Sequence, residues 1–368
     1  QIGILTGGGD APGLNAVIRA VVRTAIGEFG MKCIGIEDSF EGLLGETKTR
    51  QLLTKSVSGL LPRGGTILGT RNRGTFVEHH PDGSFLIPDE PIREAIENMG
   101  KLGIEALVVL GGEGTLAIAE KFHQYGFPVI GVPKTIDNDL ASTELTFGFM
   151  TAIDIATEAL DRLHTTAASH DRVMILEVMG RNTGWIALHS GLAGSADVIL
   201  MPEIPFTMDA IVAKIHKREE SGSRFTNIVV AEGAIEKGGT EIYLDSGSSD
   251  HAKRLGGVGD HVRRRIEAMT GKEARCVVLG HLQRGGSPNA FDRMLATNFG
   301  ACAVRALAEG ERGKMVALQA AGVVTVPLAE AIANVKCVPY NGQLIRTARD
   351  IGISFAAVDE AIYADSRS

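Results

Sequence analysis

The amino-acid sequence predicts an α/β fold of two doubly wound, mainly parallel-sheet (Rossmann-like) domains. Short apolar runs alternate with helical patterns along the chain, and this βα repeat is typical of parallel sheets. The runs are apolar at nearly every position, as in strands that are covered on both faces. The length of 368 residues suits two domains at roughly 150 residues each.

The elements follow one another in a regular order. A strand at 2–5 precedes a helix from Leu14 to about Phe29, whose apolar side chains recur on one face. Further strands are predicted at 106–110, 128–132, 173–179, 227–231 and 276–279. Three further helices are predicted: one that ends near Tyr125, one that begins at Trp185 and one that begins at about Asp292. Segments 37–63 and 236–262 are less regular, and the second is expected to be a mobile loop or an edge element.

Composition excludes several classes of protein. A net charge of −7 argues against binding nucleic acid through a basic surface. The four cysteines lie far apart without a Cys-x-x-Cys pair, which argues against a zinc site or a disulfide framework. No apolar run reaches 18 residues, and the start lacks the basic region of a signal peptide. We therefore expect a cytoplasmic protein with neither a membrane nor a nucleic-acid partner.

Glycine is in excess, with 46 residues where average usage gives about 26. Many lie in turns after strands, where open α/β sheets bind their ligands. Gly7-Gly8-Gly9 and Gly111-Gly112-Glu113-Gly114-Thr115 each stand between a strand and a helix, where backbone N–H groups and the helix dipole favour a phosphate. Glu113 is a candidate for phosphate-bound Mg²⁺. The alternative is a pair of tight turns with helix caps.

Residues 133–139 combine a lysine, a threonine and two carboxylates after an apolar strand. In an extended turn Asp137 and Asp139 face the same side, so that one can accept a hydroxyl proton while the other orients metal or substrate. An exposed Asx-rich turn is the alternative interpretation. Cations flank other strand ends and favour an anionic substrate; they are His170, Arg172, Arg181, Arg275, His281 and Arg284.

The motifs resemble those of the phosphofructokinase family. GGTILGTRNR at 64–73, GGEGT, PKTIDND, MGR, AEGA and GHLQRGG occur in the family's order over about residues 2–300. The resemblance implies phosphoryl transfer to the 1-hydroxyl of fructose 6-phosphate. It implies a donor domain at 1–147 plus about 284–333 and a fructose 6-phosphate domain at 148–283 plus about 334–368, with the active site in the cleft between them.

The resemblance also implies a role for each matched residue. Asp137 would be the base for the 1-hydroxyl, with Thr135 beside it, and Arg181 would stabilise the transferring phosphoryl group. The donor would contact Gly9, Arg73, Glu113, Gly114, Thr115 and Lys134, with Mg²⁺ near Glu113. Fructose 6-phosphate would contact Thr135, Asp137, Asp139, Met179, Gly180, Arg181, Glu232, His281 and Arg284. Arg172 and Arg275 would reach the 6-phosphate from a neighbouring subunit, which implies a homodimer or homotetramer.

Several positions depart from the family pattern. Glu113 stands where an aspartate is usual. Gly114 matches members that use ATP, whereas Lys134 matches members that use pyrophosphate. Gly114 leaves room for an α-phosphate, so we expect ATP as the donor, with pyrophosphate as the alternative. Arg19 and Arg23 match two arginines of the family's effector site, but Thr54 and His164 replace two others. A different kinase with a glycine-rich turn and a non-catalytic metabolite sensor are the remaining hypotheses.

Overall fold

A computed structural model describes residues 1–71, 74–79, 85–243 and 255–357. The chain divides into two compact units, of which unit 1 holds Gln1–Thr151 and Arg284–Val335. Unit 2 holds Ala152–Gln283 and Lys336–Ser368. The first division falls after Thr151 rather than after residue 147. The assignment of one unit to the donor and the other to the sugar phosphate stays a prediction.

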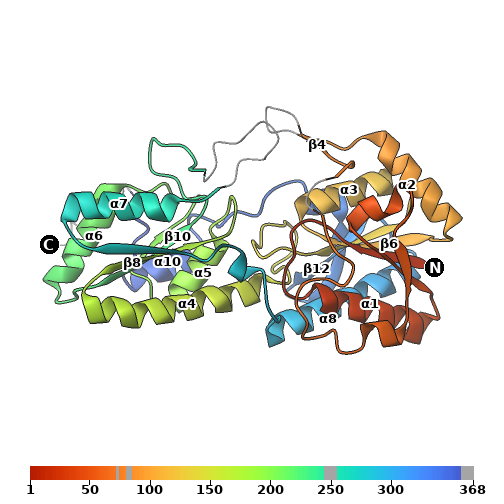
Figure 1. Ribbon diagram of the computed structural model, residues 1–368, viewed down its shortest axis with the longest axis horizontal. Coiled ribbons are helices and arrows are strands. Elements are labelled where there is room, and N and C mark those ends of the chain that lie inside the picture. Colours follow the sequence, from red (N-terminus) through yellow and green to blue (C-terminus); the bar gives the residue numbers. More distant parts are fainter. Residues whose placement is uncertain (72–73, 80–84, 244–254, 358–368) are drawn as a thin grey trace. The chain divides into compact units, whose positions relative to one another are not determined.

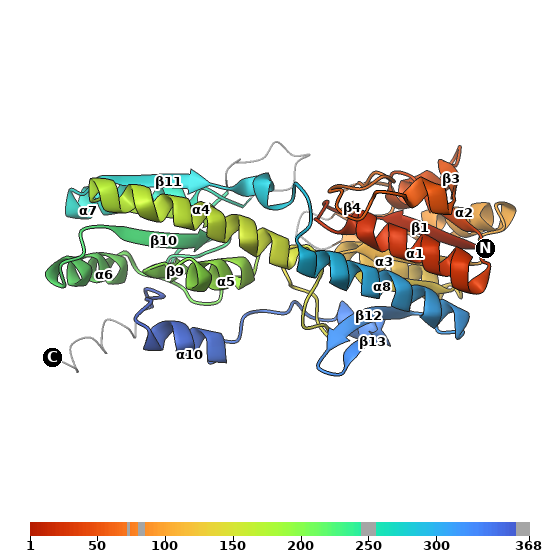
Figure 2. The same cartoon turned by 90° about the horizontal axis from the view of Figure 1, so that it is seen from below.

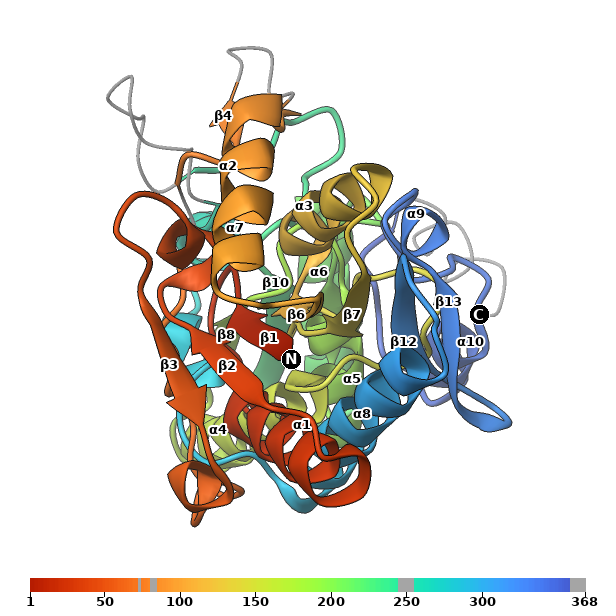
Figure 3. The same cartoon turned by 90° about the vertical axis from the view of Figure 1, so that its right-hand side faces the viewer.

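Unit 1 is built on a seven-stranded sheet within the described residues, with the strand order β13-β12-β7-β6-β1-β2-β3 (Figure 3). The strands are β1 (Ile2–Thr6), β2 (Cys33–Ile36), β3 (Thr49–Leu52), β6 (Ala106–Gly111), β7 (Val129–Pro133), β12 (Lys314–Gln319) and β13 (Gly322–Pro327). β1, β2, β6, β7 and β12 pair in parallel, whereas β3 and β13 at the two edges pair antiparallel. β4 (Glu78–His79) and β5 (Phe85–Leu86) pair antiparallel in a separate two-stranded sheet.

Helices cover both faces of this sheet (Figure 1). One face carries α1 (Leu14–Phe29) and α8 (Ala290–Ala308), and the other carries α2 (Asp89–Lys101), α3 (Glu113–Gln124) and the short α9 (Leu328–Ala331). Two 3₁₀ turns, η1 (Ser39–Leu43) and η2 (Thr54–Val57), lie between β2 and β4 along the chain. An apolar core fills each side of the sheet, because the strands bury their alternate side chains on opposite faces.

Unit 2 has a parallel four-stranded sheet in the order β11-β8-β10-β9. Its strands are β8 (Val173–Val178), β9 (Val198–Leu200), β10 (Thr226–Ala231) and β11 (Ala274–Val278). Helices α6 (Met208–Glu220) and α7 (Val258–Thr270) cover one face, and α4 (Phe149–His170) and α5 (Trp185–Ala193) lie on the other (Figure 1). η3 (Gly280–Gln283) follows β11, and α10 (Gln343–Asp350) lies beside α5 (Figure 2).

The predicted α/β class with mainly parallel sheets is confirmed. Helix α1 begins and ends where the apolar pattern predicts, and Gly30 ends it in the left-handed region with φ 61°. The prediction for segment 236–262 is wrong at its end, since α7 begins at Val258, and residues 244–254 lie outside the described part. None of the helices within the described ranges combines the length and apolarity needed to cross a bilayer.

Candidate active site

The first glycine loop follows β1 and is held from outside by the segment 66–71. Gly8 has a φ of 74°, which favours glycine. Its N–H donates to the carbonyl of Arg71 at 3.1 Å, and Thr70 Oγ1 donates to the Gly8 carbonyl at 2.5 Å. Thr6 Oγ1 donates to the carbonyl of Gly69 at 2.6 Å. The loop is therefore a fixed backbone cradle. Arg73, predicted to contact the donor, lies outside the described residues.

Thr115 connects the two glycine loops by packing. Its side chain is buried, and a Cβ built on Gly7 would stand 2.6 Å from its Cγ2. A Cβ on Gly111 would stand 2.8 Å from its Oγ1. Neither glycine has a positive φ, so close approach to Thr115, and not backbone conformation, requires glycine at both positions.

Lys134 follows β7 and reaches back to the first loop. Its side chain is only 5% exposed, and its Nζ donates to the carbonyl of Gly9 at 2.5 Å. Burial is the main cause that lowers the pKa of Lys134 to about 8. The charge of Arg284 acts in the same direction, and the charges of Asp137, Asp139 and Asp10 oppose it. The ammonium group therefore lies against the first glycine loop and loses its proton within the pH range of ordinary enzyme assays.

This pKa leads to a prediction about pH. If Lys134 assists donor binding as a cation, the KM for the donor should rise as pH rises through about 8, because the ammonium group then loses its proton. The measurement is the donor KM from pH 6.5 to 9.5 at saturating fructose 6-phosphate. Lys134→Met should raise this KM by about tenfold below pH 8 and flatten its pH dependence. The matched control is Lys101→Met, because Lys101 is an exposed residue at the end of α2. If Lys134→Met keeps the wild-type dependence of the donor KM on pH, the cationic role of Lys134 is wrong.

The turn that carries Asp137 is buried and is held by hydrogen bonds within the turn and from Thr146. Thr135 Oγ1 accepts a hydrogen bond from the Asp137 N–H at 3.0 Å. Thr146 Oγ1 donates to the Thr135 carbonyl at 2.7 Å, and the Thr146 N–H donates to Asn138 Oδ1 at 3.1 Å. Because Thr135, Asp137 and Asn138 are all buried, the alternative of an exposed Asx-rich turn is wrong.

Thr146 is a positioning residue that sequence reasoning missed. It has no exposed surface, and it braces Asn138, whose φ of 52° is in the left-handed region. A single threonine in an irregular segment carries no sequence signal. Only the fold reveals its contact with the Asp137 turn. Asp139 follows in the same turn and is half-buried.

Glu113 and Gly114 open helix α3. Glu113 is half-buried, and Gly112 at the N-cap makes no side-chain capping bond. Gly114 is exposed, and a Cβ built on it would meet no atom within 4 Å. The described part of the chain contains no group of three or more His, Cys, Asp or Glu side chains that could hold a metal. The single carboxylate of Glu113 fits Mg²⁺ that arrives on a phosphate, because Mg²⁺ usually takes one or two carboxylates together with phosphate oxygens and water.

Arg284 lies in unit 1, against the first glycine loop. A Cβ built on Gly9 would overlap Nη1 of Arg284 and stand 2.9 Å from its Cζ. The chain after Arg284 packs on residues 62–64, where Ser287 Oγ donates to the Pro62 carbonyl. The resemblance assigns Arg284 to the sugar phosphate, but in unit 1 its neighbours are those of the predicted donor loop.

In unit 2, a second set of predicted residues lies at the carboxyl ends of strands. Met179, Gly180 and Arg181 follow β8, Glu232 follows β10, and His281 lies in η3 after β11. The Arg181 N–H donates to Glu232 Oε1 at 3.0 Å. Gly180 and Arg181 both have positive φ, 139° and 51°, so this turn holds a non-glycine residue in the left-handed region. The Arg181 and His281 side chains are exposed.

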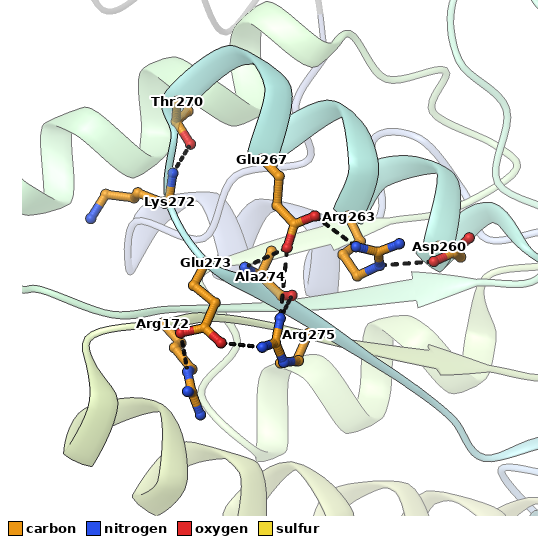
Figure 4. A network of polar contacts seen from close by, with 9 residues as sticks. All are labelled: Arg172, Asp260, Arg263, Glu267, Thr270, Lys272, Glu273, Ala274 and Arg275. Carbon is orange, nitrogen blue, oxygen red and sulfur yellow. Dashed lines mark hydrogen bonds and ion pairs between the residues drawn. The ribbon is translucent and has the colours of Figure 1, made fainter.

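Arg172 and Arg275 lie at the opposite end of the same sheet. Arg172 precedes β8, and Arg275 is the second residue of β11. The two arginines share one carboxylate, since Arg172 Nε donates to Glu273 Oε2 at 2.8 Å and Arg275 pairs with Glu273 Oε1 (Figure 4). The six residues of β8 separate Arg172 from the turn that holds Arg181 by about 20 Å, and Arg275 pairs with Met174 near the same end of the sheet as Arg172. Neither arginine follows its strand, and the assignment of this pair to the sugar phosphate stays a prediction.

Comparisons with known proteins agree on one family. The family model described as "Phosphofructokinase" matches residues 1–307. A curated "ATP-dependent 6-phosphofructokinase" of Chloroflexus aggregans is 57% identical over 96% of this chain and 97% of its own. A "Pyrophosphate--fructose 6-phosphate 1-phosphotransferase" of Streptomyces coelicolor is 50% identical over 92% and 96%. Among solved structures, Pichia pastoris phosphofructokinase has a TM-score of 0.78 at 35% identity over 90% of this chain and 35% of its own.

Proposed function

The chain belongs to the phosphofructokinase family, and on this basis we propose that it transfers a phosphoryl group from ATP to the 1-hydroxyl of fructose 6-phosphate. The product is fructose 1,6-bisphosphate. One observation on this chain's own residues supports the proposal. The buried carboxylate of Asp137 interacts electrostatically with the buried ammonium group of Lys134, which lies beside a glycine loop. Phosphoryl transfer needs positioning and charge neutralisation of this kind.

The proposed roles follow from the chemistry of each group. Asp137 accepts the proton of the attacking 1-hydroxyl while Thr135 fixes its backbone. The Gly7–Gly9 loop and Lys134 hold donor phosphates, and Arg181 stabilises the charge on the transferring group. Mg²⁺ bound to the donor neutralises phosphate charge, with Glu113 as the candidate protein ligand. Glu232, Met179, Gly180, His281 and Asp139 are proposed to contact the sugar phosphate.

The donor is tested by assaying ATP and pyrophosphate at equal concentration with the same coupled detection of fructose 1,6-bisphosphate. The open space beside Gly114 supports ATP, because an acidic side chain there would repel an α-phosphate. Turnover with ATP supports the proposal. Turnover with pyrophosphate alone would replace it with the pyrophosphate-dependent reaction, and turnover with neither donor would refute both.

The separation of the two arginine sets supports an oligomer. Arg172 lies about 20 Å from Arg181 along β8, and Arg275 pairs with Met174 near the same far end of the sheet, which separates both from Arg181 within one chain. We therefore propose that a second copy supplies Arg172 and Arg275, in a homodimer or homotetramer. Both arginines are partly exposed, with side-chain accessibilities of 28% and 51%, which leaves them open to an anion.

Activation by ADP is predicted to be weak or absent. Arg19 and Arg23 lie on α1, but Thr54 begins η2 and His164 lies on α4 where arginines would be expected. His164 Nδ1 lies 3.3 Å from Asn227 Nδ2, and its ring meets Phe225 edge-on, so it is engaged within unit 2. The measurement is fructose 6-phosphate saturation with and without ADP. A clear ADP-induced shift of the curve would contradict the prediction.

A further inference from the structure

The turn that carries Arg181 closes on itself within unit 2. The Gly180 carbonyl accepts hydrogen bonds from the Thr183 N–H at 2.9 Å and from Thr183 Oγ1 at 3.1 Å, and Thr183 is buried. Gly184 follows as the N-cap of α5. At its first end the turn is held by Glu232, which accepts the Arg181 N–H. The position of the guanidinium therefore depends on what holds the second end.

Glu203, which follows β9, holds that second end. Its Oε1 accepts a hydrogen bond from the Gly184 N–H at 3.1 Å. A Cβ built on Gly184 would stand 2.9 Å from Glu203 Oε2 and 2.5 Å from the Cβ of Met201. Because Gly184 has a φ of −95°, close approach and not backbone conformation requires glycine here. One carboxylate therefore holds each end of the turn, Glu232 at Arg181 and Glu203 at Gly184.

The same carboxylate oxygen binds the C-terminal part of the chain. The Val338 N–H donates to Glu203 Oε1 at 2.9 Å. Trp185, the first residue of α5, donates from Nε1 to the Lys336 carbonyl at 2.6 Å, and Lys336 Nζ lies 5.5 Å from the centre of the Trp185 ring. Lys336 is where the chain re-enters unit 2. The segment 336–338 is therefore attached to the start of α5 at two points.

The two oxygens of Glu203 have different surroundings. Oε2 is buried and has no hydrogen-bond partner among the described residues. Burial raises the pKa of the Glu203 carboxyl, and the hydrogen bonds from Val338 and Gly184 oppose this shift. The turn is thus held by hydrogen bonds to Oε1, which a neutral amide oxygen at the same place can also accept.

We propose that Glu203 is a positioning residue for phosphoryl transfer, which fixes the end of the Arg181 turn and attaches the segment 336–338 to it. The inference rests on the proposed function, in which Arg181 stabilises the transferring group. It gives the C-terminal segment a part in the site, because Val338 shares the acceptor that holds Gly184. A misplacement of about 1 Å can cost about 100-fold in rate, so a loosened turn lowers kcat without removing any group that contacts substrate.

The first test is a series of substitutions at Glu203. Glu203→Met keeps the length of the side chain but removes the acceptor, and it should lower kcat about 10- to 100-fold. The donor KM should stay within about threefold, since the predicted donor residues lie in unit 1. Glu203→Gln keeps an acceptor at the same reach and should have a kcat within about threefold of wild type. Glu203→Asp withdraws the carboxylate by one methylene and should lie between the two; it carries the test if Glu203→Met does not fold.

The matched control for this series is Glu158→Met, at an exposed position of α4, which should leave kcat unaltered. No loss of kcat in Glu203→Met and Glu203→Asp would overturn the proposal. An equal loss in Glu203→Gln and Glu203→Met would overturn it as well, because the negative charge and not the hydrogen bonds would then be what matters.

A double-mutant cycle with Arg181→Ala separates positioning from a general effect on the fold. Once the guanidinium is absent, Glu203→Met has nothing left to misplace, so it should lower kcat by no more than about a further threefold. The same additional loss in the wild-type and Arg181→Ala backgrounds would mean that Glu203 supports unit 2 as a whole, and the positioning role would be wrong.

The last test does not require turnover. Hydrogen exchange read by mass spectrometry should become faster in Glu203→Met in both the segment with Gly184 and the segment with Val338, and stay near the wild-type rate in Glu203→Gln. Unchanged exchange in either segment would overturn the proposal. A wild type without turnover on ATP or pyrophosphate would refute the proposed function, and the exchange rates would still decide whether Glu203 holds the turn and the C-terminal segment together.

Discussion

Asp137→Asn is expected to lower kcat by about 10³-fold, the middle of the range for loss of a general base. The substitution keeps the size of the side chain and its backbone bond to Thr135 Oγ1, but the amide cannot accept the hydroxyl proton. Because the turn is braced by Thr146, the site should keep its shape, and the Kd values for donor and fructose 6-phosphate should change by no more than about threefold. Single-turnover kinetics together with direct binding measurements check both expectations.

The control for Asp137→Asn is Asp161→Asn, at an exposed position of α4. It makes the same chemical change away from the site and should leave kcat unaltered. Full activity in Asp137→Asn would remove this carboxylate as the base. A loss of activity that is matched by loss of both ligands' binding would instead mean that the aspartate serves the structure of the turn.

The strand–turn–helix units could be predicted from sequence because their signals are local. Helix α1 shows its apolar face within its own residues, and β1, β6 and β7 are short runs that are buried on both faces. The edges of the unit 1 sheet gave weaker signals. β13 is only partly buried along most of its length, so its pattern resembles a surface segment, and the antiparallel pairing of β12 with β13 depends on contacts outside the strand.

The candidate site could be predicted in its chemistry but only partly in its geometry. The glycine loops and the Asp137 turn carry their residues close together in sequence. Lys134 and Gly9 are 125 positions apart, and no local pattern indicates that the ammonium group bonds that carbonyl. The positions of the arginines could be predicted better. Arg172 comes before β8 and Arg181 comes after it, so the two lie at opposite ends of a parallel sheet, and the sequence order alone indicates this.

Arg181 leads to the second large prediction, in which activity and stability move in opposite directions. Its φ of 51° costs a side-chain-bearing residue about 1–2 kcal/mol, whereas glycine adopts this region freely. The turn is nevertheless fixed, because the Arg181 N–H donates to Glu232 and a Cβ on Gly233 would overlap the Arg181 carbonyl. A strained residue held this firmly is typical of a functional position.

Arg181→Gly is therefore expected to lower kcat by about 10³-fold, as for a lost transition-state guanidinium, and to raise the free energy of unfolding by about 1 kcal/mol. Steady-state kinetics and chemical denaturation measure the two effects on the same preparation. Arg181→Ala is the matched comparison, since it removes the same guanidinium but keeps a Cβ in the left-handed region, so it should lose activity equally without the gain in stability. A stability loss in Arg181→Gly would show that the arginine side chain supports the fold, and unchanged kcat in both variants would remove it from the reaction.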